Sequence, residues 1–188
     1  MKTVTLTDTC SKWDYIDKVL RPKGWKYAGS GAYGVVYTKG KAAIKLGQVT
    51  GNKGYLKYIE SVAELDDNPS KPIVSELTYC TPKDGGEYDR FFIVMMERLQ
   101  PLHWDDDDDV DSIDAIINRL AYNYRDSAAE IDGIIKKLKR ERSKQRGLMK
   151  VIEKIVELTK QGCGLDIHSG NLMVRPGTDE LVITDPLV

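Results

Sequence analysis

A glycine-rich turn followed by a short strand-like stretch constrains the fold of this chain most. Residues 29–36 read GSGAYGVV, and residues 42–45 read AAIK. The glycines fit the pattern G-x-G-x-x-G, which occurs in nucleotide-binding folds and also in ordinary tight hairpins. In a dinucleotide-binding fold a helix follows the glycines, whereas residues 35–37, Val-Val-Tyr, are typical of a strand. The sequence therefore predicts a glycine hairpin and a third strand that ends at Lys45. No GK[ST] tripeptide is present, which excludes the phosphate loop of P-loop NTPases.

The rest of the chain divides into a strand-rich part and a helical part. Apolar periodicity and turn residues predict five strands, with one helix after the third strand, in the first hundred residues. From Pro101 to about residue 162 the pattern is helical, and a hairpin signal follows at Pro176-Gly177. The predicted helices lie within residues 7–20, 52–65, 105–124, 134–150 and 148–162, and the predicted strands lie within 25–38, 41–47, 72–80, 89–99 and 171–186.

Composition excludes several classes of partner. Lys plus Arg number 28 against 29 Asp plus Glu, so there is no general attraction to nucleic acid or to an anionic membrane surface. The longest strongly apolar run, residues 91–96, is too short to span a bilayer. The cysteines Cys10, Cys80 and Cys163 are far apart in the sequence, which favours reduced thiols over disulfides or a zinc site. We expect a soluble cytoplasmic protein.

A second group of polar residues lies near the end of the sequence. Asp166 and Asn171 are five positions apart in LDIHSGNLMV, between an amphipathic helix and a predicted hairpin that ends at Thr184-Asp185. Phosphoryl transfer uses a carboxylate near the attacking hydroxyl and oxygen ligands that hold Mg²⁺ against the phosphates. One acid, one amide and one further acid supply these groups.

Taken in order, the glycine hairpin, the Ala-Ile-Lys strand, the Asp166–Asn171 loop and Asp185 resemble the protein-kinase fold across essentially the whole chain. The resemblance implies an α+β, two-lobed protein-kinase-like fold. Its N-lobe, residues 1–100, would have a five-stranded antiparallel sheet, and its C-lobe, residues 101–188, would be a minimal, truncated helical lobe. It also implies ATP and Mg²⁺ as cofactors.

The resemblance assigns ATP contacts to the N-lobe. Lys45 would contact the α- and β-phosphates and pair with a helix glutamate, for which we choose Glu60, with Glu64 as the rival. The ATP-binding residues that the resemblance implies are Gly29, Ser30, Gly31, Tyr33, Gly34, Val36, Ala43, Lys45, Glu60, Met96, Glu97 and Leu99. Met96 would be the gatekeeper, and the backbone of Glu97 and Leu99 would hold the adenine.

The same resemblance assigns the chemical step to the C-lobe. Asp166 would be the base or would orient the attacking hydroxyl. Asn171 and Asp185 would bind Mg²⁺. His168 would either contact the γ-phosphate or brace the loop, and the sequence favours neither role.

Departures from the kinase pattern leave three functions open. The tract DIHSGN is similar to the loop of aminoglycoside and choline phosphotransferases, whereas the whole ending, DIHSGNLMVRPGTDELVITDP, is most similar to early protein kinases of short-tailed lytic bacteriophages. We therefore expect a Mg-ATP-dependent Ser/Thr protein kinase that acts on host proteins and on itself in the cytoplasm of an infected bacterium.

One alternative is a small-molecule phosphotransferase, in which the acidic residues 105–109 would attract a cationic substrate. The other is a non-catalytic kinase-like module that binds a host protein. The sequence ends three residues after Asp185. On that basis we expect no activation segment, and an enzyme that is active without a phosphorylation switch.

Overall fold

The computed structural model describes residues 2–5, 11–101, 146–166, 169–178 and 180–188. The chain forms two compact units, one comprising Met1–Lys53 with Ile73–Arg98 and the other Gly54–Pro72 with Leu99–Val188. The predicted lobe boundary near residue 100 is close to the second of these junctions, but helix α2 groups with the second unit. The acidic run at 105–109, the predicted helix over 105–124 and most of the predicted helix that starts at residue 134 lie outside the described residues.

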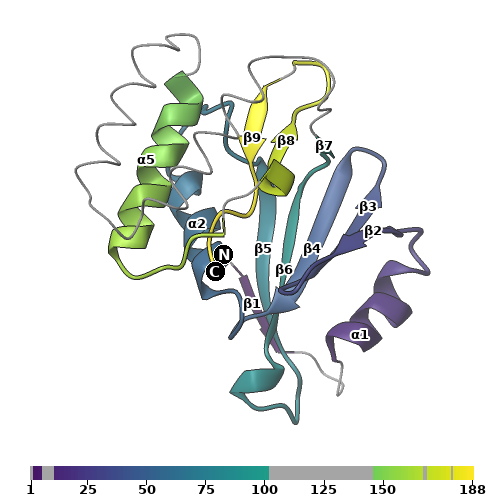
Figure 1. Ribbon diagram of the computed structural model, residues 1–188. Coiled ribbons are helices and arrows are strands. Elements are labelled where there is room, and N and C mark those ends of the chain that lie inside the picture. The colour runs from purple at the N-terminus through teal and green to yellow at the C-terminus, as the bar shows by residue number, and fades with distance from the viewer. Residues whose placement is uncertain (1, 6–10, 102–145, 167–168, 179) are drawn as a thin grey trace. The chain divides into compact units, whose positions relative to one another are not determined.

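The elements follow the predicted order (Figure 1). In the first unit they are β1 (Lys2–Thr5), α1 (Lys12–Tyr15) with a π-helical turn (Ile16–Leu20), β2 (Lys26–Ser30), β3 (Val35–Lys39), β4 (Ala42–Gln48), β5 (Val74–Thr81), a 3-10 turn (Glu87–Asp89) and β6 (Phe91–Glu97). Helix α2 (Lys53–Ala63) starts at the junction, and β7 (Gln100–Pro101), α5 (Arg146–Lys160), a 3-10 turn (Ser169–Asn171), β8 (Leu172–Val174) and β9 (Leu181–Ile183) belong to the second unit.

The sheet of the first unit has six strands in the order β1-β5-β6-β4-β3-β2. Five of them are antiparallel neighbours, as the sequence predicted, and make the fold α+β. The expected number of strands is wrong by one, because β1 adds to the edge of the sheet, parallel to β5 (Figure 1). This pairing joins residues more than seventy positions apart, so a local pattern in four residues could not predict it.

Alternation along the strands gives the glycine hairpin two different faces. Val35 is paired with Leu46 in the register of β3 and β4, and both are buried in one hydrophobic cluster with Ile16 and Leu20. Val36 is paired with Lys45 and therefore lies on the opposite face. Because Val35 and Leu46 pack into the core with the π-helical turn, Lys45 must lie on the other face of the sheet.

The second unit is built around a hairpin of β8 and β9, to which β7 adds as a third strand. The Tyr58 hydroxyl of α2 donates a hydrogen bond to the Ile183 carbonyl over 2.7 Å, and the Ile183 N–H donates to the Ser70 carbonyl over 3.2 Å. Asn68 connects the same segment to α5 by donating to the Gly147 carbonyl over 3.0 Å. These bonds fasten α2 and the loop after it to the β9 strand.

None of the described helices is long and apolar enough to cross a membrane. Among the described residues, Cys80 and Cys163 are buried free thiols, and Cys10 lies outside the described residues.

Candidate active site

The glycine hairpin closes on itself and on β4. The Gly31 N–H donates to the Gly34 carbonyl over 2.9 Å, between the end of β2 and the start of β3. A Cβ atom at Gly34 would lie 2.9 Å from the Leu46 carbonyl oxygen and 3.1 Å from Lys45 Cε. Glycine is therefore required at position 34 because the loop passes so close to the stem of Lys45. A Cβ atom added at Gly29 or at Gly31, by contrast, would meet no heavy atom within 4 Å beyond its chain neighbours.

Lys45 is held in the middle of the sheet with other predicted ATP-binding residues. Its side chain is only 8% exposed, and in the register it lies opposite Val36 on β3 and Val94 on β6. Ala43, two residues earlier, lies opposite Met96. Since directly paired residues and residues two apart share a face of a sheet, these predicted residues form one surface. A buried lysine beside apolar side chains is suited to a ligand that brings negative charge.

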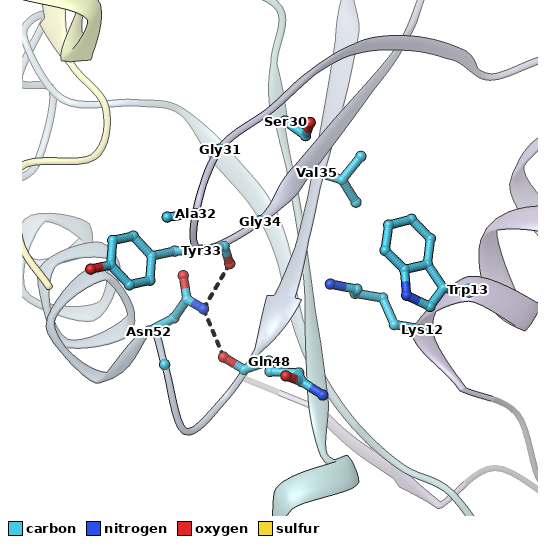
Figure 2. A pocket seen from close by; sticks show the side chains of 11 residues that line it. Lys12, Trp13, Ser30, Gly31, Ala32, Tyr33, Gly34, Val35, Gln48 and Asn52 are labelled. Carbon is cyan, nitrogen blue, oxygen red and sulfur yellow. Dashed lines mark hydrogen bonds between the residues drawn. The ribbon is translucent and has the colours of Figure 1, made fainter.

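The other face of the hairpin carries a pocket of about 300 Å³ (Figure 2). Its lining residues are Lys12, Trp13, Ser30, Gly31, Ala32, Tyr33, Gly34, Val35, Gln48, Gly51 and Asn52. Lys45 is not among them, and Val35 points to this side, so the pocket lies behind the glycine loop rather than over Lys45. Lys12 supplies its charge, with Nζ 4.8 Å from the centre of the Trp13 ring, and burial lowers the pKa of that amine.

In the second unit a single side chain connects the three polar residues that the sequence placed together. Asn171 Nδ2 donates to the Asp166 carbonyl and to the Asp185 carbonyl, each over 2.6 Å. The Asp166 N–H in turn donates to the Pro186 carbonyl over 2.9 Å, and the Thr184 N–H donates to the Asn171 carbonyl over 2.9 Å. The loop before β8 and the segment after β9 are thus held side by side.

This arrangement fits a magnesium ion. Because Nδ2 of Asn171 is committed to two carbonyl groups, Oδ1 is the atom of that amide left to act as a ligand. The Asp185 carboxylate is half-buried in the same cluster. Amide and carboxylate oxygens are hard donors, and Mg²⁺ is typically bound by one or two such groups together with phosphates and water. The described residues contain no cluster of three or more His, Cys, Asp and Glu that could hold a metal without such help.

Two buried tyrosines of α2, Tyr55 and Tyr58, lie close to Asp185 in this cluster. Tyr55 and Tyr58 are fully buried, and the pKa of each hydroxyl is raised well above its ordinary value, first by burial and then by the negative charge of Asp185. The hydrogen bond from Tyr58 to Ile183 fixes the backbone two residues before Asp185. No sequence signal predicts this role, because a buried tyrosine on a helix is ordinarily a core residue.

The predicted glutamates, Glu60, Glu64 and Glu97, lie on α2, just after α2 and at the end of β6. Glu60 is exposed on α2, in the second unit, whereas Lys45 belongs to the first. The rival, Glu64, follows the end of α2, and its carboxylate lies 3.6 Å from Lys154 Nζ. Glu97 Oε1 accepts a hydrogen bond from the Ile73 N–H over 2.9 Å.

Leu99, the first residue of the second unit after the strand that carries Met96, is buried. His168 lies outside the described residues.

One family model matches the chain over its second half. The model of the family described as Bacteriophage T7 protein kinase 0.7 matches residues 88–188, a range that contains Asp166, Asn171 and Asp185. The glycine hairpin and Lys45 precede the matched range. A search of curated proteins found no match. Since the match covers more than half of the sequence, the chain belongs to the bacteriophage T7 protein kinase family.

Proposed function

We propose that the protein is a Mg-ATP-dependent kinase that transfers the γ-phosphate of ATP to serine and threonine side chains of host proteins, and to its own. Membership of a phage protein kinase family supports ATP as donor and protein as acceptor. The observation that carries the proposal is the Asn171 side chain, which joins the Asp166 and Asp185 backbones and leaves hard oxygen ligands for a metal.

The first unit supplies the phosphate-binding groups. Lys45, buried on the face that it shares with Val36 and Ala43, neutralises charge on the α- and β-phosphates. The glycine hairpin covers the phosphates with its backbone N–H groups, and the open space at Gly29 and Gly31 allows close approach. Ser30 and Tyr33 belong to the same loop and complete the predicted contacts.

The second unit supplies the groups for the chemical step. Asn171 Oδ1 and the Asp185 carboxylate would hold Mg²⁺, which when bound neutralises the charge of the phosphates. Asp166 accepts a hydrogen bond from the attacking hydroxyl and takes its proton as the phosphoryl group leaves ATP for that oxygen. The proposal assigns Lys45, Asp166, Asn171 and Asp185 to the same nucleotide.

The remaining roles follow the kinase resemblance. Met96 is the gatekeeper, and the backbone of Glu97 and Leu99 holds the adenine. Glu60 is the partner of Lys45, which the ion pair of Glu64 with Lys154 supports. His168 contacts the γ-phosphate or braces its loop. Because its proposed substrates are host proteins, the enzyme would act in the cytoplasm of the infected bacterium.

Transfer of label from [γ-³²P]ATP to proteins of a bacterial extract tests the proposal. The wild type should label protein bands and itself with phosphoserine and phosphothreonine, and Lys45→Ala should lose most of that activity, about a hundredfold or more, because charge stabilisation supplies most of the catalysis. Label that appears on an added aminoglycoside and on no protein would instead indicate a small-molecule phosphotransferase. A partner retained equally by the wild type and by Asp166→Ala, with no label anywhere, would indicate a binding module.

A further inference from the structure

Asn52 ties the turn after β4 to the tip of the glycine loop. Its Nδ2 donates to the Tyr33 carbonyl over 2.8 Å and to the Gln48 carbonyl over 2.7 Å (Figure 2). Asn52 is only 2% exposed, and both of its hydrogen bonds are partly buried. Partial burial limits competition from water, so these bonds constrain the loop more than fully exposed contacts would.

The orientation of the Asn52 amide is fixed by its surroundings. Two carbonyl oxygens face one end of the amide, so that end must be the NH₂ group. The other end, Oδ1, is buried and has no hydrogen-bond partner among the described residues.

Asn52 directly precedes the first residue of α2, where an asparagine commonly caps the helix by accepting a hydrogen bond at Oδ1. Here Oδ1 does not do so, although a buried unsatisfied oxygen is unfavourable. The side chain therefore serves the glycine loop rather than the helix.

The loop tip also lies close to β4 at Gly47. A Cβ atom at Gly47 would lie 2.6 Å from the Tyr33 carbonyl oxygen and 2.7 Å from the Phe92 ring. Glycine at this position leaves the space that the Tyr33 carbonyl occupies. The turn that carries Asn52 is itself anchored, since the Asn52 N–H donates to the Val49 carbonyl over 3.2 Å and the Val49 N–H donates to the Arg90 carbonyl over 3.1 Å.

We propose that Asn52 is a positioning residue that holds the glycine loop in its phosphate-covering conformation before ATP binds. This inference rests on the proposed kinase function. The loop is otherwise exposed at Ser30 to Tyr33, and beyond the pairing of β2 with β3 its tip is closed by the bond from the Gly31 N–H to the Gly34 carbonyl. A loop ordered in advance loses less conformational entropy when ATP binds. Removal of the two Asn52 hydrogen bonds, which we call the Asn52 latch, should therefore weaken ATP binding.

The test compares three variants in the full chain. Asn52→Ala removes both hydrogen bonds. Asn52→Asp keeps the shape of the side chain but turns an oxygen toward each carbonyl. Asn68→Ala is the matched control, because Asn68 is also a buried asparagine, bonded to the Gly147 carbonyl and the Ser70 N–H in the other unit.

Two measurements distinguish loss of the Asn52 hydrogen bonds from a general loss of stability. In the protein without nucleotide, hydrogen exchange of residues 29–36 should be at least tenfold faster in both Asn52 variants and unchanged in Asn68→Ala. With ATP, both Asn52 variants should raise KM about fivefold to tenfold, and kcat should change less than twofold. Asn68→Ala should lower the melting temperature without changing KM.

Three results would overturn the inference. One is a wild-type rate of exchange at residues 29–36 in Asn52→Ala. Another is an active enzyme whose KM is unchanged in both Asn52 variants, which would leave the proposed function intact. A wild-type protein that neither binds ATP nor transfers phosphate would contradict both. If Asn52→Ala does not fold, Asn52→Ser, whose hydroxyl can donate to one carbonyl only, should give intermediate exchange and an intermediate KM.

Discussion

Nδ2 of Asn171 lies 2.6 Å from the carbonyl oxygen of Asp185, fourteen residues further along the chain. The same atom lies 2.6 Å from the carbonyl oxygen of Asp166. Two acceptors at this distance require a donor between them, so the amide is needed for its NH₂ group as well as for its oxygen. This dual use distinguishes asparagine from aspartate at position 171.

Asn171→Asp should therefore be a poor substitute, although a carboxylate is a good ligand for Mg²⁺. The new oxygen would face the carbonyls of Asp166 and Asp185, and the repulsion would push both backbone segments away and displace the metal site. We expect the apparent affinity for Mg²⁺ to fall about 10-fold to 100-fold, the usual effect of losing a group that orients a ligand. Initial rates of phosphate transfer over a range of Mg²⁺ concentrations measure this. A variant with the Mg²⁺ dependence of the wild type would show that the donated bonds are unimportant.

The glycines of the loop should differ in their tolerance of alanine. Gly34→Ala places a methyl group 2.9 Å from the Leu46 carbonyl oxygen, and overpacking of this kind lowers the free energy of unfolding by about 1–3 kcal/mol. Gly31→Ala meets no atom within 4 Å, so its effect should stay within about 0.5 kcal/mol. Urea denaturation of the two variants makes the comparison. Equal losses would mean that the close approach at Gly34 is not what selects glycine there.

The sequence was sufficient to predict which site residues come together where a short motif lies within alternating strands. Val36 and Lys45 share a face because the predicted strands pair directly, with Val36 opposite Lys45. Asp166, Asn171 and Asp185 come together because a tight hairpin necessarily returns the chain to its starting edge. In both places the local pattern determines the geometry.

The sequence was insufficient where contacts between distant segments decide. Strand β1 exists because β5 offers an unpaired edge. Asn52 precedes a helix and looks like a cap, but the carbonyl of Tyr33, nineteen residues earlier, determines its orientation. The one sequence signal for this latch is Gly47 inside a strand, because glycine within a strand often marks a close backbone approach.

Arg175 should contribute more to stability than its place beside a turn suggests. Its guanidinium donates to the Pro69 and Lys71 carbonyls and to the Glu180 carboxylate, over 2.5, 2.9 and 2.8 Å. Arg175→Ala should lower the free energy of unfolding by about 2–3 kcal/mol, because it leaves two partly buried carbonyls without their charged donor. Glu180→Gln removes only the half-exposed ion pair and should cost about 0.5 kcal/mol. Chemical denaturation that ranks the two variants in the reverse order would contradict this assignment.

The Arg175 contact also predicts an acid dependence. The hydrogen bond from Arg175 lowers the pKa of Glu180 below its usual 4.5. A lowered carboxyl pKa adds stability above pH 4.5 that is lost as the pH falls through the folded-state pKa. The difference in stability between wild type and Glu180→Gln should therefore shrink below pH 4.5. A difference that is constant from pH 7 to pH 3 would exclude the contribution.

The buried tyrosines predict behaviour at high pH. The pKa of Tyr55 and of Tyr58 is raised above 10.0, so the stability that their neutral hydroxyls provide is complete below pH 10 and is lost as the pH rises further. Absorbance at 295 nm should show these two phenols ionising only as the protein unfolds, after the exposed tyrosines. In Tyr58→Phe the amplitude of the late step should fall by half. Ionisation of both phenols in the folded protein would contradict their burial against Asp185.

Intact-mass spectrometry after incubation with Mg-ATP is the decisive test of the proposed kinase activity, because each transferred phosphate adds a discrete mass. The wild type should add one or more phosphates to itself and to a host acceptor protein. Asp185→Asn, which removes one metal-binding carboxylate and keeps the shape of the side chain, should reduce the rate about a hundredfold or more. Phosphate transfer by Asp185→Asn at the wild-type rate, or a wild type that gains no phosphate and modifies no host protein, would contradict the account.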